Sequence, residues 1–297
     1  MRVVTALTAT GLTKTYRTLF GGERRALRGL SLMVDRGVAF GLIGPNGAGK
    51  TTFIKVLLGV VRPSGGDVTV LGGPPDDLSI RARIGYLPER MHLPAALTGR
   101  HFLRSVSTLK SLAPSEAELA RHLERVGLKP DSQRIGTYSK GMRQRLGLAA
   151  AMLGAPDLLI LDEPTDGIDP VGRVEVRALL LEEKARGATL LLNSHLLSET
   201  ERVCDRIGVL HEGQLKLEGS LDDVRRVTTV WTVRFAEGVS LDVVRAAGFL
   251  EGQFQGDVDA LNAALDEVRA QGAKLVALAP AARDLEQVLA DVMGAAP

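Results

Sequence analysis

Apolar and polar residues alternate along the first part of the chain in a way that predicts two strands, a loop and a helix. The opening segment is rich in Val and Thr and predicts a strand that runs into a loop near Tyr16. A second predicted strand, residues 30–37, precedes an apolar run at 38–44 of the kind found inside a sheet core. A glycine-rich loop follows, and helical spacing then predicts a helix with an apolar face of Phe53, Val56, Leu57 and Val60.

The middle of the chain is predicted to be helical, and the strand–helix order returns after it. Residues from about 90 to 145 show helical spacing without a convincing strand, and we interpret them as a helical subdomain. The predicted strand at 158–162, helix at 173–187 and strand at 188–195 restore the βαβ order of a parallel sheet. The fold class is therefore α/β.

A boundary near residue 227 divides the chain into a larger domain, residues 1–226, and a small α/β domain, residues 227–297. In the small domain Leu261, Leu265 and Val268 share one helix face, which is the pattern of a helix that packs on a core. This part of the sequence has no convergent cluster of acids, histidines or loop glycines. We expect it to support dimer formation or regulation.

Composition and charge exclude several classes of protein. The formal net charge of the 297 residues is +2 and the basic residues are scattered, so we expect no nucleic-acid partner. The single cysteine, Cys204, excludes an internal disulfide and suits a reducing cytoplasm. Because no stretch of about 20 lipid-compatible residues occurs, any membrane contact is expected to come through a partner.

The strongest chemical signal is the glycine-rich run "GPNGAGKTT", which follows a buried strand and opens a helix. Its glycines let backbone N–H groups point at phosphate oxygens, and the helix N-terminus adds a favourable dipole. Lys50 is expected to reach the β- and γ-phosphates, and the Thr51 hydroxyl to bind Mg²⁺. The predicted phosphate-binding residues are Gly44, Pro45, Asn46, Gly47, Ala48, Gly49, Lys50, Thr51 and Thr52.

Two adjacent acids end the apolar strand "LLILD". The carboxyl ends of parallel strands are where ligands bind, so Asp162 is predicted to hold Mg²⁺ through water. Glu163 is placed to polarise the water that attacks the phosphate. Together with the glycine-rich run, these acids predict a nucleotide phosphohydrolase.

A segment between these two motifs, "TYSKGMRQRLGLA", narrows the prediction. Ser139 precedes an apolar helix and reads as an N-cap beside N–H groups that can bind an anion. The segment also resembles the signature motif of ATP-binding cassette (ABC) proteins, in which Ser139 and Gly141 would contact a γ-phosphate. Tyr138, Lys140 and Met142 depart from the family consensus at the other three places.

Further family marks follow in the expected order over about residues 3–225. Tyr16 resembles the aromatic residue that stacks on adenine, and Asp169, in "EPTDGID", resembles the acid of the D-loop. His195 resembles the switch histidine that contacts the γ-phosphate. Glu89 stands where the family usually has a glutamine, and a carboxylate there can still approach Mg²⁺ or the attacking water.

The resemblance implies an ABC cassette with a helical subdomain, which uses ATP and Mg²⁺. The "YLPE" spelling around Glu89 is similar to the branch whose permeases are of the ABC-2 type, mostly exporters. That branch implies a separate multi-span permease, with the chain at the cytoplasmic face of the cell membrane. The family closes as a head-to-tail pair, made of two copies of one chain or of a mixture. Because this chain carries a complete set of motifs, we expect a homodimer. The alternative is a membrane-associated regulatory or mechanical ABC ATPase that drives no transport.

Overall fold

The computed structural model describes residues 5–17, 22–236, 240–282 and 284–294. The chain divides into two compact units, Met1–Leu221 and Asp222–Pro297, and each is described by itself. The boundary that the sequence predicts at residue 227 lies just inside strand β10 (Arg226–Phe235). In the described part of the chain, no helix has the length and apolar character needed to cross a membrane.

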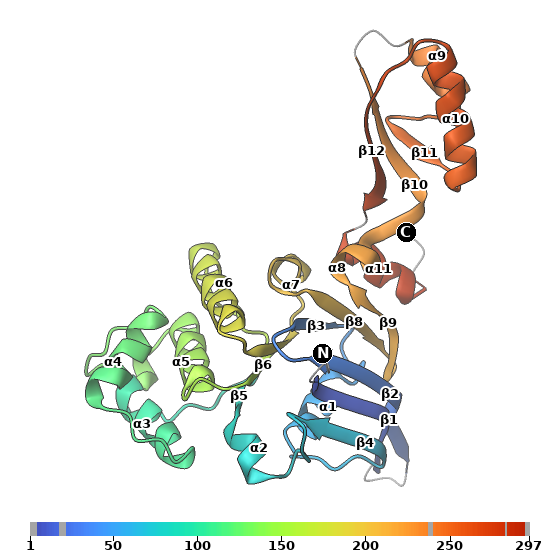
Figure 1. Ribbon diagram of the computed structural model, residues 1–297. Coiled ribbons are helices and arrows are strands. Elements are labelled where there is room, and N and C mark those ends of the chain that lie inside the picture. The colour runs from blue at the N-terminus through green and yellow to red at the C-terminus, as the bar shows by residue number, and fades with distance from the viewer. Residues whose placement is uncertain (1–4, 18–21, 237–239, 283, 295–297) are drawn as a thin grey trace. The chain divides into compact units, whose positions relative to one another are not determined.

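A six-stranded sheet forms the centre of the first unit, in the order β5-β6-β7-β3-β8-β9 (Figure 1). The strands from β5 to β8 run parallel, and β9 pairs antiparallel with β8. Strands β3, β6 and β7 are buried along their whole length, as the apolar runs predict. The strands are β3 (Ala39–Ile43), β5 (Ile84–Leu87), β6 (Leu158–Asp162), β7 (Thr189–Asn193), β8 (Arg206–His211) and β9 (Gln214–Ser220).

A second, antiparallel sheet has the order β2-β1-β4. Its strands are β1 (Thr5–Arg17), β2 (Glu23–Asp35) and β4 (Gly65–Val70). Strand β2 begins well before residue 30, where the sequence predicts its start. The pattern misses the first half of the strand because this half contains mostly charged residues and few apolar ones. Tyr16 lies near the end of β1 and pairs with Arg24 on β2.

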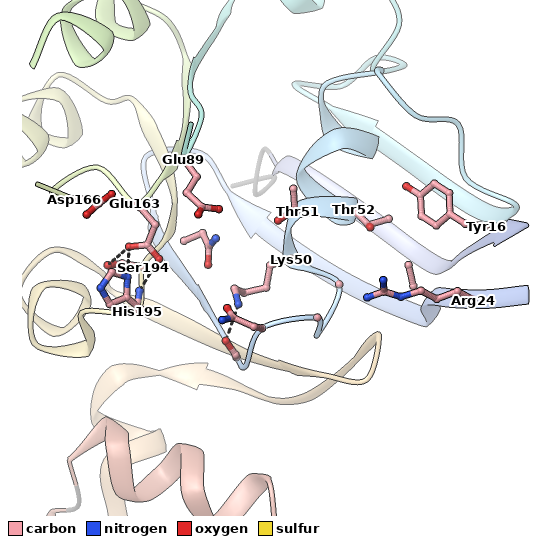
Figure 2. Close-up of a pocket in the computed structure, with 16 residues that line it drawn as sticks. Tyr16, Arg24, Lys50, Thr51, Thr52, Glu89, Glu163, Asp166, Ser194 and His195 are labelled. Atoms are coloured by element: carbon pink, nitrogen blue, oxygen red, sulfur yellow. Dashed lines mark hydrogen bonds and ion pairs between the residues drawn. The ribbon is translucent and has the colours of Figure 1, made fainter. Parts of the chain in front are cut away.

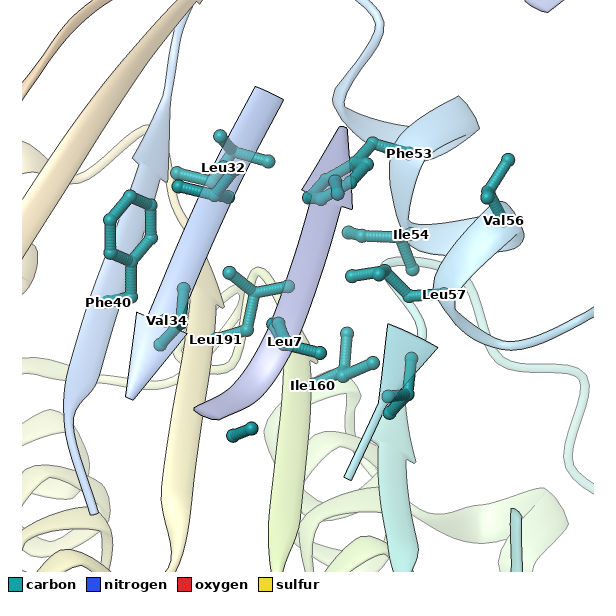
Figure 3. Close-up of a cluster of buried hydrophobic side chains, with 14 of the residues drawn as sticks. Leu7, Leu32, Val34, Phe40, Phe53, Ile54, Val56, Leu57, Ile160 and Leu191 are labelled. Atoms are coloured by element: carbon teal, nitrogen blue, oxygen red, sulfur yellow. The ribbon is translucent and has the colours of Figure 1, made fainter. Parts of the chain in front are cut away.

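The core of this unit lies between the two sheets and helix α1 (Lys50–Leu57) (Figure 3). Phe40 from β3 and Phe53 from α1 are fully buried there. Burial of each such side chain contributes about 1.5–3 kcal/mol. The prediction that Val60 belongs to this apolar face is wrong, because Gly59 adopts a φ of 66° just after the helix and Val60 is 63% exposed.

The predicted helical subdomain contains helices α3 (Gly99–Leu109) and α4 (Glu116–Arg125), which pack on α5 (Lys140–Met152). Helix α4 begins with a capping box, in which the Ser115 and Glu118 side chains each bind the other's backbone N–H. Helix α5 continues beyond residue 145, and most of its apolar residues are buried. The other helical elements of the unit are α2 (Leu78–Ala82), the 3-10 turn η1 (Ile135–Thr137), α6 (Pro170–Ala185) and α7 (Leu197–Val203).

The second unit has its own three-stranded antiparallel sheet, in the order β11-β10-β12, and its own core. Leu261, Leu265 and Val268 are buried on helix α10 (Val258–Ala270), as their spacing predicts. Phe249 packs edge-on against Phe235, with ring centroids 5.3 Å apart. After the short helix α8 (Leu221–Arg225) at the division, the elements are β10, α9 (Leu241–Ala246), β11 (Gln253–Gln255), α10 (Val258–Ala270), β12 (Leu275–Ala282) and α11 (Leu285–Val292).

Candidate nucleotide-binding site

A cleft of about 740 Å³ opens in the first unit at the carboxyl ends of the parallel strands (Figure 2). Of the residues that the sequence predicts, eleven line it: Tyr16, Gly44, Asn46, Gly47, Gly49, Lys50, Thr51, Thr52, Glu89, Glu163 and His195. Glu89 comes from the segment after β5. The structure therefore gathers into one cavity residues that are widely separated along the chain.

The glycine-rich loop between β3 and α1 needs glycine at two positions. Gly44 has a φ of 152°, and a Cβ there would lie 2.0 Å from the backbone oxygen of Leu210. Gly49 has a φ of 112°, and a Cβ there would lie 2.5 Å from the oxygen of Ala26. These contacts hold the loop tightly curled against its neighbours, so its N–H groups have a fixed direction.

Lys50 extends back over this loop. Its Nζ donates hydrogen bonds to the carbonyl oxygens of Gly44, at 2.6 Å, and Pro45, at 3.1 Å. Burial lowers the pKa of Lys50, and the nearby carboxylates of Glu163, Asp162 and Glu89 oppose that effect. An anionic ligand beside the ammonium would replace these weak acceptors with charged ones.

The N-terminus of α1 is open to an anion. Gly49 occupies its N-cap position without a side-chain cap, and the first turn contains no acidic residue. The first N–H groups of a helix lack intrahelical partners. Thr51 and Thr52 sit in this turn and line the cleft, so hydroxyl and N–H donors face the same cavity.

Asp162 ends β6 and is only 2% exposed. Asn193, at the end of the neighbouring β7, donates its Nδ2 to Asp162 Oδ1. Burial raises the pKa of Asp162, and the hydrogen bond from Asn193 opposes that effect. Asn193 Oδ1 is buried and has no hydrogen-bond partner. A carboxylate beside an unsatisfied amide oxygen is the hard-oxygen environment that suits Mg²⁺.

Glu163 is held by three contacts from the segment after β7. Its Oε1 accepts from the backbone N–H of His195 at 2.9 Å, and its Oε2 lies 2.7 Å from His195 Nδ1. The Ser194 hydroxyl donates to Oε2 at 3.3 Å. Gln144 of α5 donates to the Glu163 backbone oxygen at 2.7 Å. The residue adopts a φ of 53°, in the left-handed region that non-glycine residues rarely occupy.

Similarity to known proteins identifies the family of this chain. The family model described as "ABC transporter" matches residues 27–166. An uncharacterized ABC transporter ATP-binding protein of Nostoc sp. is 40% identical over 291 residues, which cover 93% of this chain and 86% of that protein. The chain belongs to the ABC transporter ATP-binding proteins. It is therefore an ABC ATPase.

Two further similarities bear on this ABC protein. The Nod factor export ATP-binding protein I of Rhizobium meliloti is 41% identical, over 72% of this chain and 64% of the relative. A solved dimeric ATP-binding cassette, in a post-hydrolysis state with ADP and Pi, shares the fold with a TM-score of 0.67 at 23% identity. That comparison covers 72% of this chain and 98% of the cassette.

Six predicted site residues do not line the cleft of this ABC chain. Ser139 caps α5, and its hydroxyl accepts from the Met142 N–H at 3.1 Å. Asp169 caps α6 by accepting from Gly172 N–H at 2.9 Å. Gly141 lies against the D-loop, where a Cβ would approach the Gly167 oxygen to 3.0 Å. Pro45, Ala48 and Asp162 are the other three, and Ala48 and Asp162 are buried.

Sequence reasoning missed five residues that line the cleft of this ABC protein: Arg24, Ala26, Asp166, Asn193 and Ser194. Asn193 and Ser194 directly precede His195 at the end of a predicted strand. The rule that ligands bind at the carboxyl ends of parallel strands could therefore have identified them. Asp166 lies in the quoted D-loop segment and pairs with Lys140 of α5 at 2.8 Å. Arg24 reaches the cleft only through the pairing of β1 with β2, which no local pattern reveals.

Proposed function

We propose that this chain powers export through a separate membrane permease, and that two copies close head-to-tail around two ATP molecules. One observation carries the proposal: the cleft contains the phosphate loop, Glu163 and His195, while Ser139 and Gly141 lie outside it. A second copy is the natural source of the missing signature residues. The dimeric cassette of the same fold and the relative named for Nod factor export support this arrangement.

ATP fits the cleft as follows. Tyr16 would stack on the base, the N-terminus of α1 would bind phosphate oxygens, and Lys50 would reach the β- and γ-phosphates. The oxygens of Thr51, Asp162 and Asn193 would hold Mg²⁺, which supplies charge neutralisation on the phosphates when bound. Glu89 would approach the same region of the cleft from the segment after β5.

Hydrolysis needs a water activated beside the γ-phosphate. Glu163 would accept a proton from that water while the water oxygen bonds to the γ-phosphorus. The bond from that phosphorus to the β,γ-bridging oxygen breaks, and ADP and phosphate result. His195 holds both carboxylate oxygens of Glu163 and would contact the γ-phosphate from the same side.

Head-to-tail closure would make each ATP an adhesive between two copies. Ser139 and Gly141 begin helix α5, so the partner's γ-phosphate would meet N–H groups and a hydroxyl at a helix N-terminus. A shift from mostly open to mostly closed pairs requires about 5.5 kcal/mol of differential affinity. Two phosphate groups bound by charge-assisted hydrogen bonds could supply that energy.

The permease would bind the surface of the helical subdomain, which places the chain at the cytoplasmic face of the membrane. The subdomain packs on the rest of the unit through α5, whose Gln144 contacts the Glu163 backbone. A change at the γ-phosphate therefore has a short physical route to α5. Relative motion of this helix would transmit closure to the permease.

The test uses Glu163→Gln in the purified full-length chain, with Glu267→Gln as a matched control. Glu267 is exposed on α10 of the second unit, so the control makes the same chemical change away from the cleft. We expect Glu163→Gln to bind ATP, lose turnover by at least about 10²-fold and elute as a dimer with Mg²⁺–ATP. Rapid hydrolysis by Glu163→Gln would overturn the role of Glu163.

Transport is tested by purifying the tagged chain from native membranes in mild detergent and identifying its partners. Recovery of a multi-span protein in fixed stoichiometry would support the permease. Recovery of soluble partners alone would leave the ATPase intact and remove the transport proposal.

A further inference from the structure

Arg24 is a cation in the cleft that none of the motifs explains. It lies directly opposite Tyr16 on the paired strands β1 and β2, and directly opposed residues place their side chains on the same face of a sheet. Figure 2 shows both side chains at one end of the cleft, with Glu163 and His195 at the other end and Lys50 between them.

The guanidinium of Arg24 lies beside the phosphate-binding loop. A Cβ built on Gly47 would be 3.7 Å from Arg24 Nη2, so the side chain reaches over the loop instead of pointing away into solvent. Gly47 itself has a φ of 83° and lines the same cavity. The guanidinium therefore lies next to the loop that is predicted to bind phosphate.

No acidic residue in the described part of the chain forms an ion pair with Arg24. The acids that line the cleft, Glu89, Glu163 and Asp166, come from other segments and lie at the opposite end in Figure 2. Lys50, by contrast, already donates to two carbonyl oxygens. Arg24 is therefore a permanent positive charge at a phosphate site with its donors available.

We propose that Arg24 binds the phosphate chain of the nucleotide at its ribose end, opposite Lys50. The proposal rests on the proposed function, because it assigns a further binding residue to the same ATP site. The position next to Tyr16 puts Arg24 near the base, and therefore near the α-phosphate. Its fork of N–H donors can bind two phosphate oxygens at once.

The neighbouring residue provides a matched control. Arg25 follows Arg24 on β2, so its side chain points to the opposite face of the sheet. It lines a different surface depression, together with Thr13 and Thr15. Arg25→Ala therefore removes the same charge one residue away without touching the cleft.

The experiment measures the Kd of ADP and of a non-hydrolysable ATP analogue by calorimetry for wild type, Arg24→Ala, Arg24→Lys and Arg25→Ala. We expect Arg24→Ala to weaken both ligands about tenfold, as loss of one charge-assisted contact should. Arg24→Lys should recover part of the loss, and Arg25→Ala should match wild type. The loss should shrink at about 1 M salt, where exposed charges are screened within roughly 3 Å.

Several results would overturn the assignment. Unchanged binding by Arg24→Ala would make Arg24 a solvated charge on an edge strand. Equal losses in Arg24→Ala and Arg25→Ala would indicate a general charge effect. A loss confined to the ATP analogue would move the contact to the γ-phosphate, and a loss that persists in high salt would indicate stacking on the base. Lys50→Ala must still abolish binding, and if it does not, the nucleotide site itself is wrong.

Discussion

His195 binds Glu163 through both its backbone and its side chain, with the N–H 2.9 Å from Oε1 and Nδ1 2.7 Å from Oε2. One residue thus fixes both oxygens of the carboxylate that we assign to water activation. The Glu163 side chain is 14% exposed, whereas that of His195 is 66% exposed. His195 is therefore the solvent-facing half of this pair and the half that a γ-phosphate can contact.

Replacement of His195 by alanine removes the Nδ1 contact but keeps the backbone one. We expect His195→Ala to lower kcat by about 10²-fold, a typical effect for a group that assists proton transfer. The Kd for ADP should change little, because ADP lacks the γ-phosphate and the phosphate loop is untouched. Steady-state kinetics measure the effect on kcat. The control variant is His101→Ala, because His101 is exposed on α3. Equal kcat values for both variants would contradict the role of His195.

Asp162 should make the nucleotide-free protein less stable as pH rises. Burial raises the pKa of Asp162 in the folded protein above its pKa in the unfolded chain. The contribution of Asp162 to the free energy of unfolding is therefore fully present at a pH below the unfolded-state pKa. It is lost as the pH rises through the folded-state pKa. At neutral pH Asp162→Asn should therefore raise stability by about 1 kcal/mol, or about 2–4 °C in Tm. Circular dichroism melts at pH 7, with the exposed Asp76→Asn as the control, measure this. A lower Tm for Asp162→Asn would refute the argument.

Glu183 joins the helical subdomain to α6. Its side chain is 3% exposed, and it accepts from Arg125 at 2.7 Å and from Arg186 at 2.7 Å. Its two arginine partners are 33% and 37% exposed and keep access to water, so loss of the glutamate should cost about 1–3 kcal/mol. We expect a destabilisation of that order from Glu183→Ala in urea unfolding. Glu182→Ala should cost less than about 1 kcal/mol, because Glu182 contacts the same Arg125 from a 61% exposed position.

We expect the second unit to unfold separately when an aromatic side chain is removed from its core. Phe249 is 1% exposed, and Phe249→Ala should destabilise this unit by about 3–5 kcal/mol. The chain has one tryptophan, Trp231, and its Nε1 donates to the Gly256 oxygen at 3.0 Å, so fluorescence reports on this unit alone. Leu250→Ala, at a 64% exposed position, is the matched control. We expect ATP turnover to survive in Phe249→Ala; its loss would show that the two units depend on one another.

Motifs confined to one loop were predictable from the sequence, whereas positions set by strand pairing were not. The glycine-rich loop and the strand-end acid Glu163 follow from local pattern plus the rule that parallel strands end at one edge. Strand β4 gave no usable pattern, because most of its residues are exposed or half-buried. Arg24 was missed for a different reason, since its place in the cleft depends on its register opposite Tyr16.

The left-handed backbone conformation of Glu163 costs stability at a position where the proposed activity needs a side chain. A side chain in that conformation costs about 1–2 kcal/mol, and glycine would carry no such penalty. Glu163→Gly would thus relieve the backbone while deleting the carboxylate that we assign to water activation. The backbone conformation at residue 163 would therefore favour glycine, whereas the proposed hydrolysis requires the carboxylate.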